Sequence, residues 1–111
     1  MGKPTPAGLE MLDALAEGLS DNGIAFERSQ MFGSPGLRLP GKGKFFLTLV
    51  DGDELIFKLE GAAHADALGL EGAHLFEPMA GRPMKQWVQV PPAHRGRYLE
   101  FATAAAVALG G

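Results

Sequence analysis

Two strongly apolar runs that meet at Asp51-Gly52 constrain the fold of this chain more than any other feature. The first run covers residues 44–50 and the second covers residues 54–59. An Asp-Gly pair between two such runs is the strongest local indication of a β-hairpin, because both residues tolerate the backbone angles that tight hairpin turns need. We therefore expect a central antiparallel hairpin around which the rest of the chain folds.

The register of this hairpin decides which side chains share a face. If Asp51 and Gly52 alone form the turn, Val50 pairs with Asp53 and Phe46 pairs with Phe57. The opposite face would then also be apolar, with the side chains of Phe45, Leu47, Leu49 and Ile56. A sheet with two apolar faces needs cover on both. Three helices of the same chain could supply it, which we favour, or a second copy could cover one face in a homodimer.

The rest of the chain predicts helices at both ends and several short strands. Thr5 is suited to be the N-cap of a first helix and Pro6 its first residue, and Asn22-Gly23 ends it. Further strands are expected at residues 24–32, 37–39, 74–76 and 86–90, with a turn at 33–36, a short helix at 61–68 and an alanine-rich last helix ending near residue 110. The prediction is one α+β domain over residues 1–111, with a mostly antiparallel sheet of about five strands packed with N-terminal and C-terminal helices.

Composition narrows the class of protein. The chain has 111 residues, 46% of them hydrophobic and 21% charged, which is typical of one soluble globular domain. There is no cysteine, so a disulfide framework is excluded, and no apolar run is long enough for a membrane span; we expect a cytoplasmic protein. A net charge of −3 argues against general binding to nucleic acid, although Arg38, Lys42 and Lys44 form one local basic stretch.

Several short motifs together resemble one known family. They are Met31-Phe32-Gly33 with Gly36, Asp51-Gly52-Asp53-Glu54-Leu55, Gly81-Arg82-Pro83-Met84, and Trp87-Val88 with Val90-Pro91. This order resembles the N-terminal domain of the TfoX/Sxy competence regulators and, more distantly, the YjbR/MmcQ group, over residues 7–109. The resemblance implies an α+β fold and a regulatory or interaction role without enzymatic activity. Two-domain members of the family have a further helical domain that this sequence lacks, so their regulatory output is not carried over directly.

The segment from Gly81 to Trp87 supplies the candidate ligand or partner contacts. Arg82 stands between glycine and proline, where a constrained turn would hold its guanidinium ready to clamp a carboxylate or phosphate. Lys58, Lys85 and Trp87 complete the candidate set. The interpretation that we favour is structural: Arg82 pairs with an acid to fix the turn, and Trp87 fills the core. Lys58 either extends to solvent or pairs with an acid.

Motifs of catalysis and metal binding are incomplete. Residues 36–43 match a phosphate-binding loop until Gly43, where that loop needs Ser or Thr. The three histidines, His64, His74 and His94, have neither cysteine partners nor the spacing of a zinc site. We predict no catalytic residue, metal or cofactor. The sequence favours a non-enzymatic interaction or regulatory module with an unknown protein partner; the alternative is a small-molecule or anion binder using the Gly81-to-Met84 turn, and nucleic-acid binding is weaker still.

Overall fold

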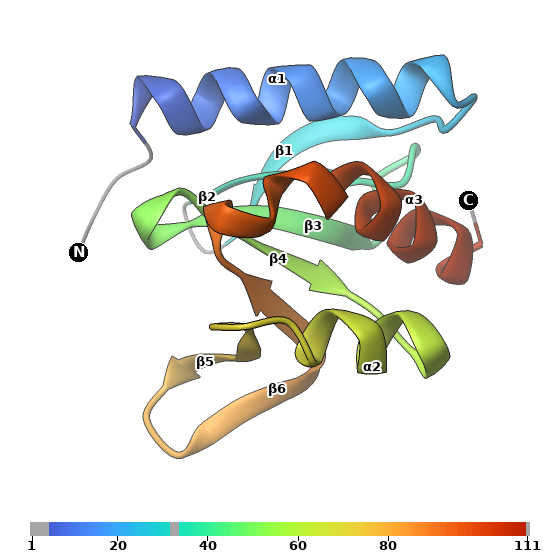
Figure 1. Ribbon diagram of the computed structural model, residues 1–111. Helices are drawn as coiled ribbons and strands as arrows, with labels where there is room; N and C mark the ends of the chain where they lie inside the picture. The colour runs from blue at the N-terminus through green and yellow to red at the C-terminus, as the bar shows by residue number, and fades with distance from the viewer. Residues whose placement is uncertain (1–4, 32–33, 111) are drawn as a thin grey trace.

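The computed structural model describes residues 5–31 and 34–110. Within these residues, three α-helices, six β-strands and two short 3₁₀ helices follow one another: α1 (Pro6–Asp21), β1 (Glu27–Met31), β2 (Ser34–Arg38), β3 (Phe45–Val50), η1 (Asp51–Asp53), β4 (Glu54–Lys58), α2 (Gly61–Leu68), β5 (His74–Met79), β6 (Arg82–Val90), η2 (Pro92–Arg97) and α3 (Tyr98–Ala108). The strands form one antiparallel sheet in the order β1-β2-β3-β4-β6-β5 (Figure 1). The predicted α+β class is confirmed, with six strands where about five were expected.

The helix boundaries follow from local chemistry. Thr5 caps α1, because its Oγ1 accepts a hydrogen bond from the Gly8 amide at 3.1 Å, and Pro6 begins the helix. Asn22 ends it, followed by Gly23 at φ 77°. All of these boundaries were predicted from the sequence. None of the helices in the described residues combines the length and hydrophobicity needed to cross a bilayer.

Two predicted turns differ from the structure. Residues 34–36 belong to strand β2, where Ser34 pairs with Met31. Phe32 and Gly33, which were also assigned to this strand and turn, lie outside the described residues. The Gly81-to-Met84 segment is likewise mostly strand, because β6 begins at Arg82 and pairs there with Met79. The constrained turn expected around Arg82 therefore consists of residues 80 and 81.

The register predicted for the central hairpin is wrong by one residue. The turn contains three residues, with Gly52 at φ 76° and Asp53 at φ 58°, so that Val50 lies opposite Glu54. The Asp53 carboxylate accepts hydrogen bonds from the Thr5 amide at 3.1 Å and the Thr5 hydroxyl at 2.6 Å. A contact with the start of α1, 48 residues away in sequence, thus holds the turn.

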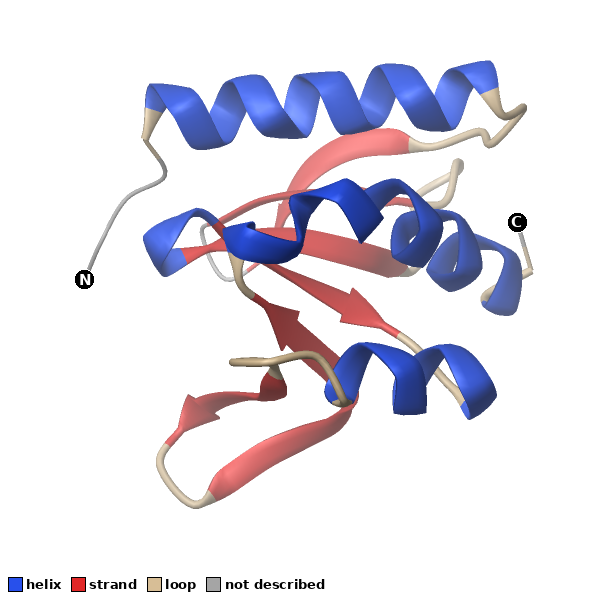
Figure 2. Cartoon of the chain, viewed as in Figure 1, coloured by secondary structure: helices blue, strands red, loops and turns tan. Residues whose placement is uncertain are grey.

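One residue of register exchanges the two faces of a strand. Leu47 therefore lies opposite Phe57, and Leu49 opposite Leu55, on a single face of the hairpin. All three helices pack on this face, since their buried side chains form one cluster with it: Leu12, Leu15 and Leu19 of α1, Ala67 of α2, and Tyr98, Phe101, Ala102, Ala105 and Ala106 of α3. Figure 2 shows α3 crossing in front of the strands. The core is therefore a helix layer on one side of the sheet.

Phe46 joins the same core through a bulge. The pairing of β2 with β3 shifts between Leu37 and Arg38, so that Phe46 has no partner opposite it while Leu37 pairs with Leu47. A bulge of this kind re-aims the side chain of the extra residue. Phe46 is accordingly fully buried in the cluster that contains Leu47.

The second face of the sheet is the one that the helices of the described residues do not cover; we call it the open face. One row of paired residues crosses it through all six strands: Ser29, Gly36, Thr48, Ile56, Gln89 and His74. The expected second apolar set was wrong, because Leu47 and Leu49 belong to the core face. Ile56 is fully buried within the single chain, and Phe45 is half-buried. Three of the four side chains that motivated a homodimer are thus fully buried without a second copy, and Phe45 is partly covered.

Candidate functional site

Three of the four candidate contact residues lie together. Lys58 on β4 is directly opposite Trp87 on β6, and Lys85 precedes Trp87 by two positions on the same strand. Arg82 lies at the far end of β6, beside the turn that joins it to β5. The structure therefore separates Arg82 from the other candidates.

The structure bears out one part of the favoured interpretation and not the other: Trp87 is buried, whereas Arg82 has no acidic partner among the described residues. Trp87 is only 7% exposed, but it lies outside the main core cluster, on the face that it shares with Lys58. Arg82 and Lys85 are exposed. Within residues 5–31 and 34–110, no ion pair involves Arg82, Lys58 or Lys85. An acidic partner does not fix the Arg82 turn; Gly81, at φ 79°, supplies its backbone geometry instead.

Lys58 and Lys44 line a small pocket beside the C-terminal end of α3. It has a volume of about 240 Å³, and its other walls are Leu59, Glu60, Gln86, Ala108 and Leu109. Two lysines among the lining residues favour an anionic ligand, and Glu60 offsets part of their charge. We call this the lysine pocket.

A larger hollow lies where several strands end on the open face. It has a volume of about 370 Å³ and is lined by Ser34 of β2, Val50 and Asp51 at the end of β3, residues 76–78 of β5, and Gln89 of β6. A second hollow of about 530 Å³ shares Glu77 and Gln89 and continues to His74, Leu75 and Pro83. We call the two adjoining hollows the strand-end groove.

Sheet curvature creates the strand-end groove. Three strands separate β2 from β5 in the sheet, so the two would lie roughly 19 Å apart if it were flat. Both nevertheless line one hollow, which means that the sheet curls around its open face. Sequence reasoning missed this site, because no local pattern reports how strongly a sheet curls.

The polar groups of the groove are mainly hydrogen-bond acceptors. The Gln89 amide donates its Nε2 hydrogen to Glu54 Oε1 at 2.8 Å, which leaves Gln89 Oε1 as an acceptor. Asp51 and Glu77 add two exposed carboxylates. The described lining residues include no lysine or arginine. Val50, Phe76 and Pro78 supply its apolar walls.

Thr48 stands in the middle of the open face with a buried hydroxyl. The residue is 1% exposed, and its Oγ1 has no hydrogen-bond partner among the described residues. Burying a hydroxyl without a partner costs free energy that an apolar group of the same shape avoids. The Thr48 hydroxyl is thus a local source of instability.

Thr48→Val is expected to raise the free energy of unfolding by about 1 kcal/mol, because the variant keeps the shape of the side chain and removes the hydroxyl. Urea denaturation measures the change. Thr48→Ala, which also removes a methyl group, is the control and should be less stable than Thr48→Val. A Thr48→Val variant less stable than the wild type would show that the hydroxyl is hydrogen-bonded in the folded protein.

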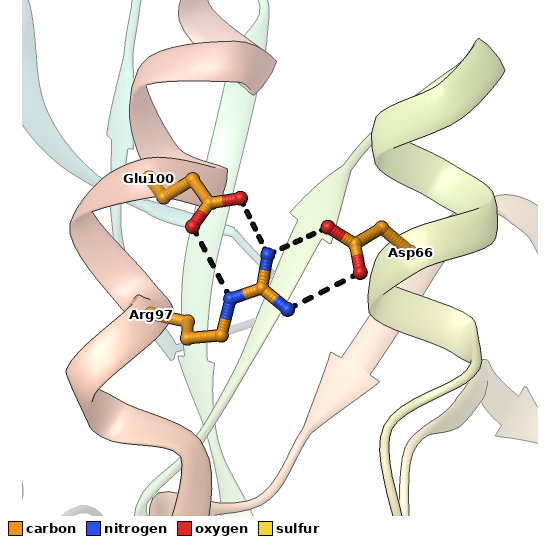
Figure 3. Close-up of polar contacts among 3 residues, drawn as sticks. All are labelled: Asp66, Arg97 and Glu100. Atoms are coloured by element: carbon orange, nitrogen blue, oxygen red, sulfur yellow. Dashed lines mark hydrogen bonds and ion pairs between the residues drawn. The ribbon is translucent and has the colours of Figure 1, made fainter.

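Arg97 joins α2 to α3. Its Nη1 and Nη2 donate to the two carboxylate oxygens of Asp66 at 3.2 and 2.6 Å, and its Nε and Nη2 donate to Glu100 at 3.2 and 2.6 Å (Figure 3). Its guanidinium carbon also lies 4.9 Å from the centre of the Phe101 ring. These hydrogen bonds raise the pKa of Arg97 and lower the pKa of Asp66. The carboxylates of Asp66 and Glu100 already pair with the guanidinium, so the role of Arg97 is to hold the two helices together.

Acid is expected to release this contact. Hydrogen bonding to Arg97 lowers the pKa of Asp66 in the folded chain, so its stabilisation is complete above the unfolded pKa of about 3.9 and is lost as pH falls through the lower folded pKa. The thermal midpoint of the wild type should therefore fall more steeply than that of Asp66→Asn between about pH 5 and pH 2. The exposed Glu71→Gln is the control. If the thermal midpoints of wild type and Asp66→Asn changed with pH in parallel, the stabilising contact between Asp66 and Arg97 would be contradicted.

The three histidines and the basic stretch at Arg38 make contacts within the chain. His64, His74 and His94 lie at separate places, where each ring donates to a backbone carbonyl at 2.7–2.9 Å. No cluster of three potential metal ligands occurs in the described part of the chain. Arg38 donates to Glu27 at 3.2 Å, and the amides of Gly41 and Lys42, followed by Arg38, lower the pKa of Glu27. The basic stretch is thus partly neutralised internally, which weakens the case for nucleic-acid binding.

Comparison with known proteins found no similar protein. A scan against protein-family models found no match, and searches of curated proteins and of solved structures found none either. The resemblance to the TfoX N-terminal domain therefore rests on the short motifs alone.

Proposed function

We propose that this chain is a non-enzymatic interaction module that binds another protein through the strand-end groove. The observation that carries the proposal is the curled open face, where four strands contribute to one hollow with apolar walls and several acceptors. Exposed apolar surface that is rimmed by polar groups marks sites where proteins bind partners or ligands. A regulatory role of the kind found in TfoX N-terminal domains is consistent with such a module.

The aromatic residue of the groove does not belong to the core, which supports a binding role for the groove rather than a structural one. Phe76 is half-buried in the groove and is not part of the core cluster, although large aromatic side chains usually belong to a core. Its neighbour Met79 is 64% exposed near the tip of the same hairpin and does not line the groove. Phe76 and Met79 therefore offer a matched pair of variants on one strand.

Capture of partners from the native cell tests the proposal. Tagged wild type, Phe76→Ala and Met79→Ala would each be used as bait, and the bound proteins would be compared by mass spectrometry. We expect at least one protein that wild type and Met79→Ala retain and that Phe76→Ala loses. A set of bound proteins that is the same for all three baits would overturn the proposal. Urea denaturation showing that Phe76→Ala is fully folded under the conditions of the capture would exclude unfolding as the cause.

The lysine pocket supports a second candidate function, the binding of a small anion. Lys58 was a candidate from the sequence, and the structure adds Lys44 beside it. The Arg82 turn is not part of this pocket. Calorimetric titration with inorganic phosphate distinguishes the two functions: binding that Lys58→Met abolishes and Phe76→Ala leaves unchanged would favour the anion binder.

A further inference from the structure

We propose that the strand-end groove recognises a segment of polypeptide in which lysine or arginine stands next to apolar residues. This inference rests on the proposed function and names the chemistry of its partner. The segment would lie along the groove, with its cationic head between Asp51 and Glu77.

The charge of the groove selects for a cation. Asp51 follows β3 and Glu77 lies on β5, yet both line the same hollow. Glu54 adds a third carboxylate, held beside the groove by Gln89. No lysine or arginine of the described lining residues opposes them. An acidic segment would meet uncompensated repulsion here, which is how like charges exclude wrong partners.

The apolar walls favour a long side chain rather than a bare ammonium ion. Val50, Phe76 and Pro78 line the same hollow as the two carboxylates. Lysine and arginine place a hydrocarbon stem behind the charge, so the stem can contact these walls while the head reaches the acids. A small inorganic cation would leave the walls in contact with water.

The length of the groove favours a polypeptide. The second hollow continues from Glu77 and Gln89 toward His74 and Pro83. The two hollows together are therefore larger than a single side chain would fill. β5 is the last strand of the sheet in the described chain, so its outer edge has no strand paired with it there. An extended segment could place one residue between the carboxylates and its apolar neighbours in the second hollow.

Selection from a phage-displayed library of random dodecapeptides tests the inference, with the full chain as the immobilised target. The best peptide would be synthesised, and its affinity measured by fluorescence polarisation at about 150 mM salt. Asp51→Asn combined with Glu77→Gln removes both charges and keeps the shape of the side chains. Glu71→Gln combined with Glu10→Gln is the matched control outside the groove.

We expect enriched peptides with lysine or arginine beside apolar residues, bound about tenfold more weakly by the Asp51→Asn, Glu77→Gln variant than by wild type or control. Peptides that lose affinity with Phe76→Ala but are neutral or acidic would overturn the cationic partner and leave the proposed function standing. Peptides that bind wild type and Phe76→Ala equally, or a selection that enriches none, would overturn both.

Discussion

Phe57→Ala is expected to lower the free energy of unfolding by about 3–5 kcal/mol, the range for removing an aromatic ring from a packed core. Phe57 is a fully buried residue of β4. Its ring centroid lies 5.6 Å from that of Tyr98 and 5.9 Å from that of Phe101, in tilted geometries. The truncation therefore leaves a cavity where α3 packs on the sheet. The expected loss is a large part of the total stability of a small domain, which is only about 5–15 kcal/mol.

Urea denaturation at constant temperature measures this loss, and an unchanged slope would show that the folded state remains compact. Phe76→Ala is the control, since its ring lies in the groove outside the core cluster, and it should cost about 1 kcal/mol. A loss below about 1 kcal/mol for Phe57→Ala would mean that the core is not centred on this residue.

Gly36→Ala is expected to cost about 1–3 kcal/mol, through overpacking between β2 and β3. A Cβ atom at Gly36 would lie 2.7 Å from the backbone oxygen of Leu47 and 2.9 Å from Thr48 Oγ1. The backbone oxygen cannot move away without disturbing the pairing of the two strands. Gly36 is thus required for the close approach of its neighbours, although the sequence suggested a turn.

Thermal and urea unfolding of Gly36→Ala and Gly96→Ala would be compared. A Cβ atom at Gly96 has no neighbour within 4 Å, so that variant should keep or slightly raise stability. Equal stability of the two variants would contradict the tight contact between Gly36 and β3.

Local chemistry made much of the fold predictable. Thr5 and Pro6 determine where α1 begins, Gly23 where it ends, and the apolar runs on either side of Asp51 specify a hairpin. The hairpin register was not predictable in this way. A two-residue Asp-Gly turn and the observed three-residue turn are both locally reasonable, and the contact between Asp53 and Thr5, which favours the second, joins residues that are distant in sequence.

The candidate site was only partly predictable for a related reason. Lys58 and Trp87 stood out as a cation and an aromatic residue in apolar surroundings, but their pairing depends on β6 lying beside β4 across an intervening strand and helix. Arg97 and Glu100 have helical spacing in the sequence, whereas Asp66 comes from another helix. The strand-end groove depends on the curl of the whole sheet, which no short motif encodes.

Amide proton–nitrogen correlation spectra of the labelled chain, recorded while the best selected peptide is added, test the central claim most directly. Binding in the groove predicts that the largest shifts occur at Ser34, Val50, Asp51, Glu77 and Gln89. The amide signals of α1 and those of residues beside Lys44 and Lys58 should not shift. Shifts concentrated at the lysine pocket or on the helices, with the groove unchanged, would contradict the account.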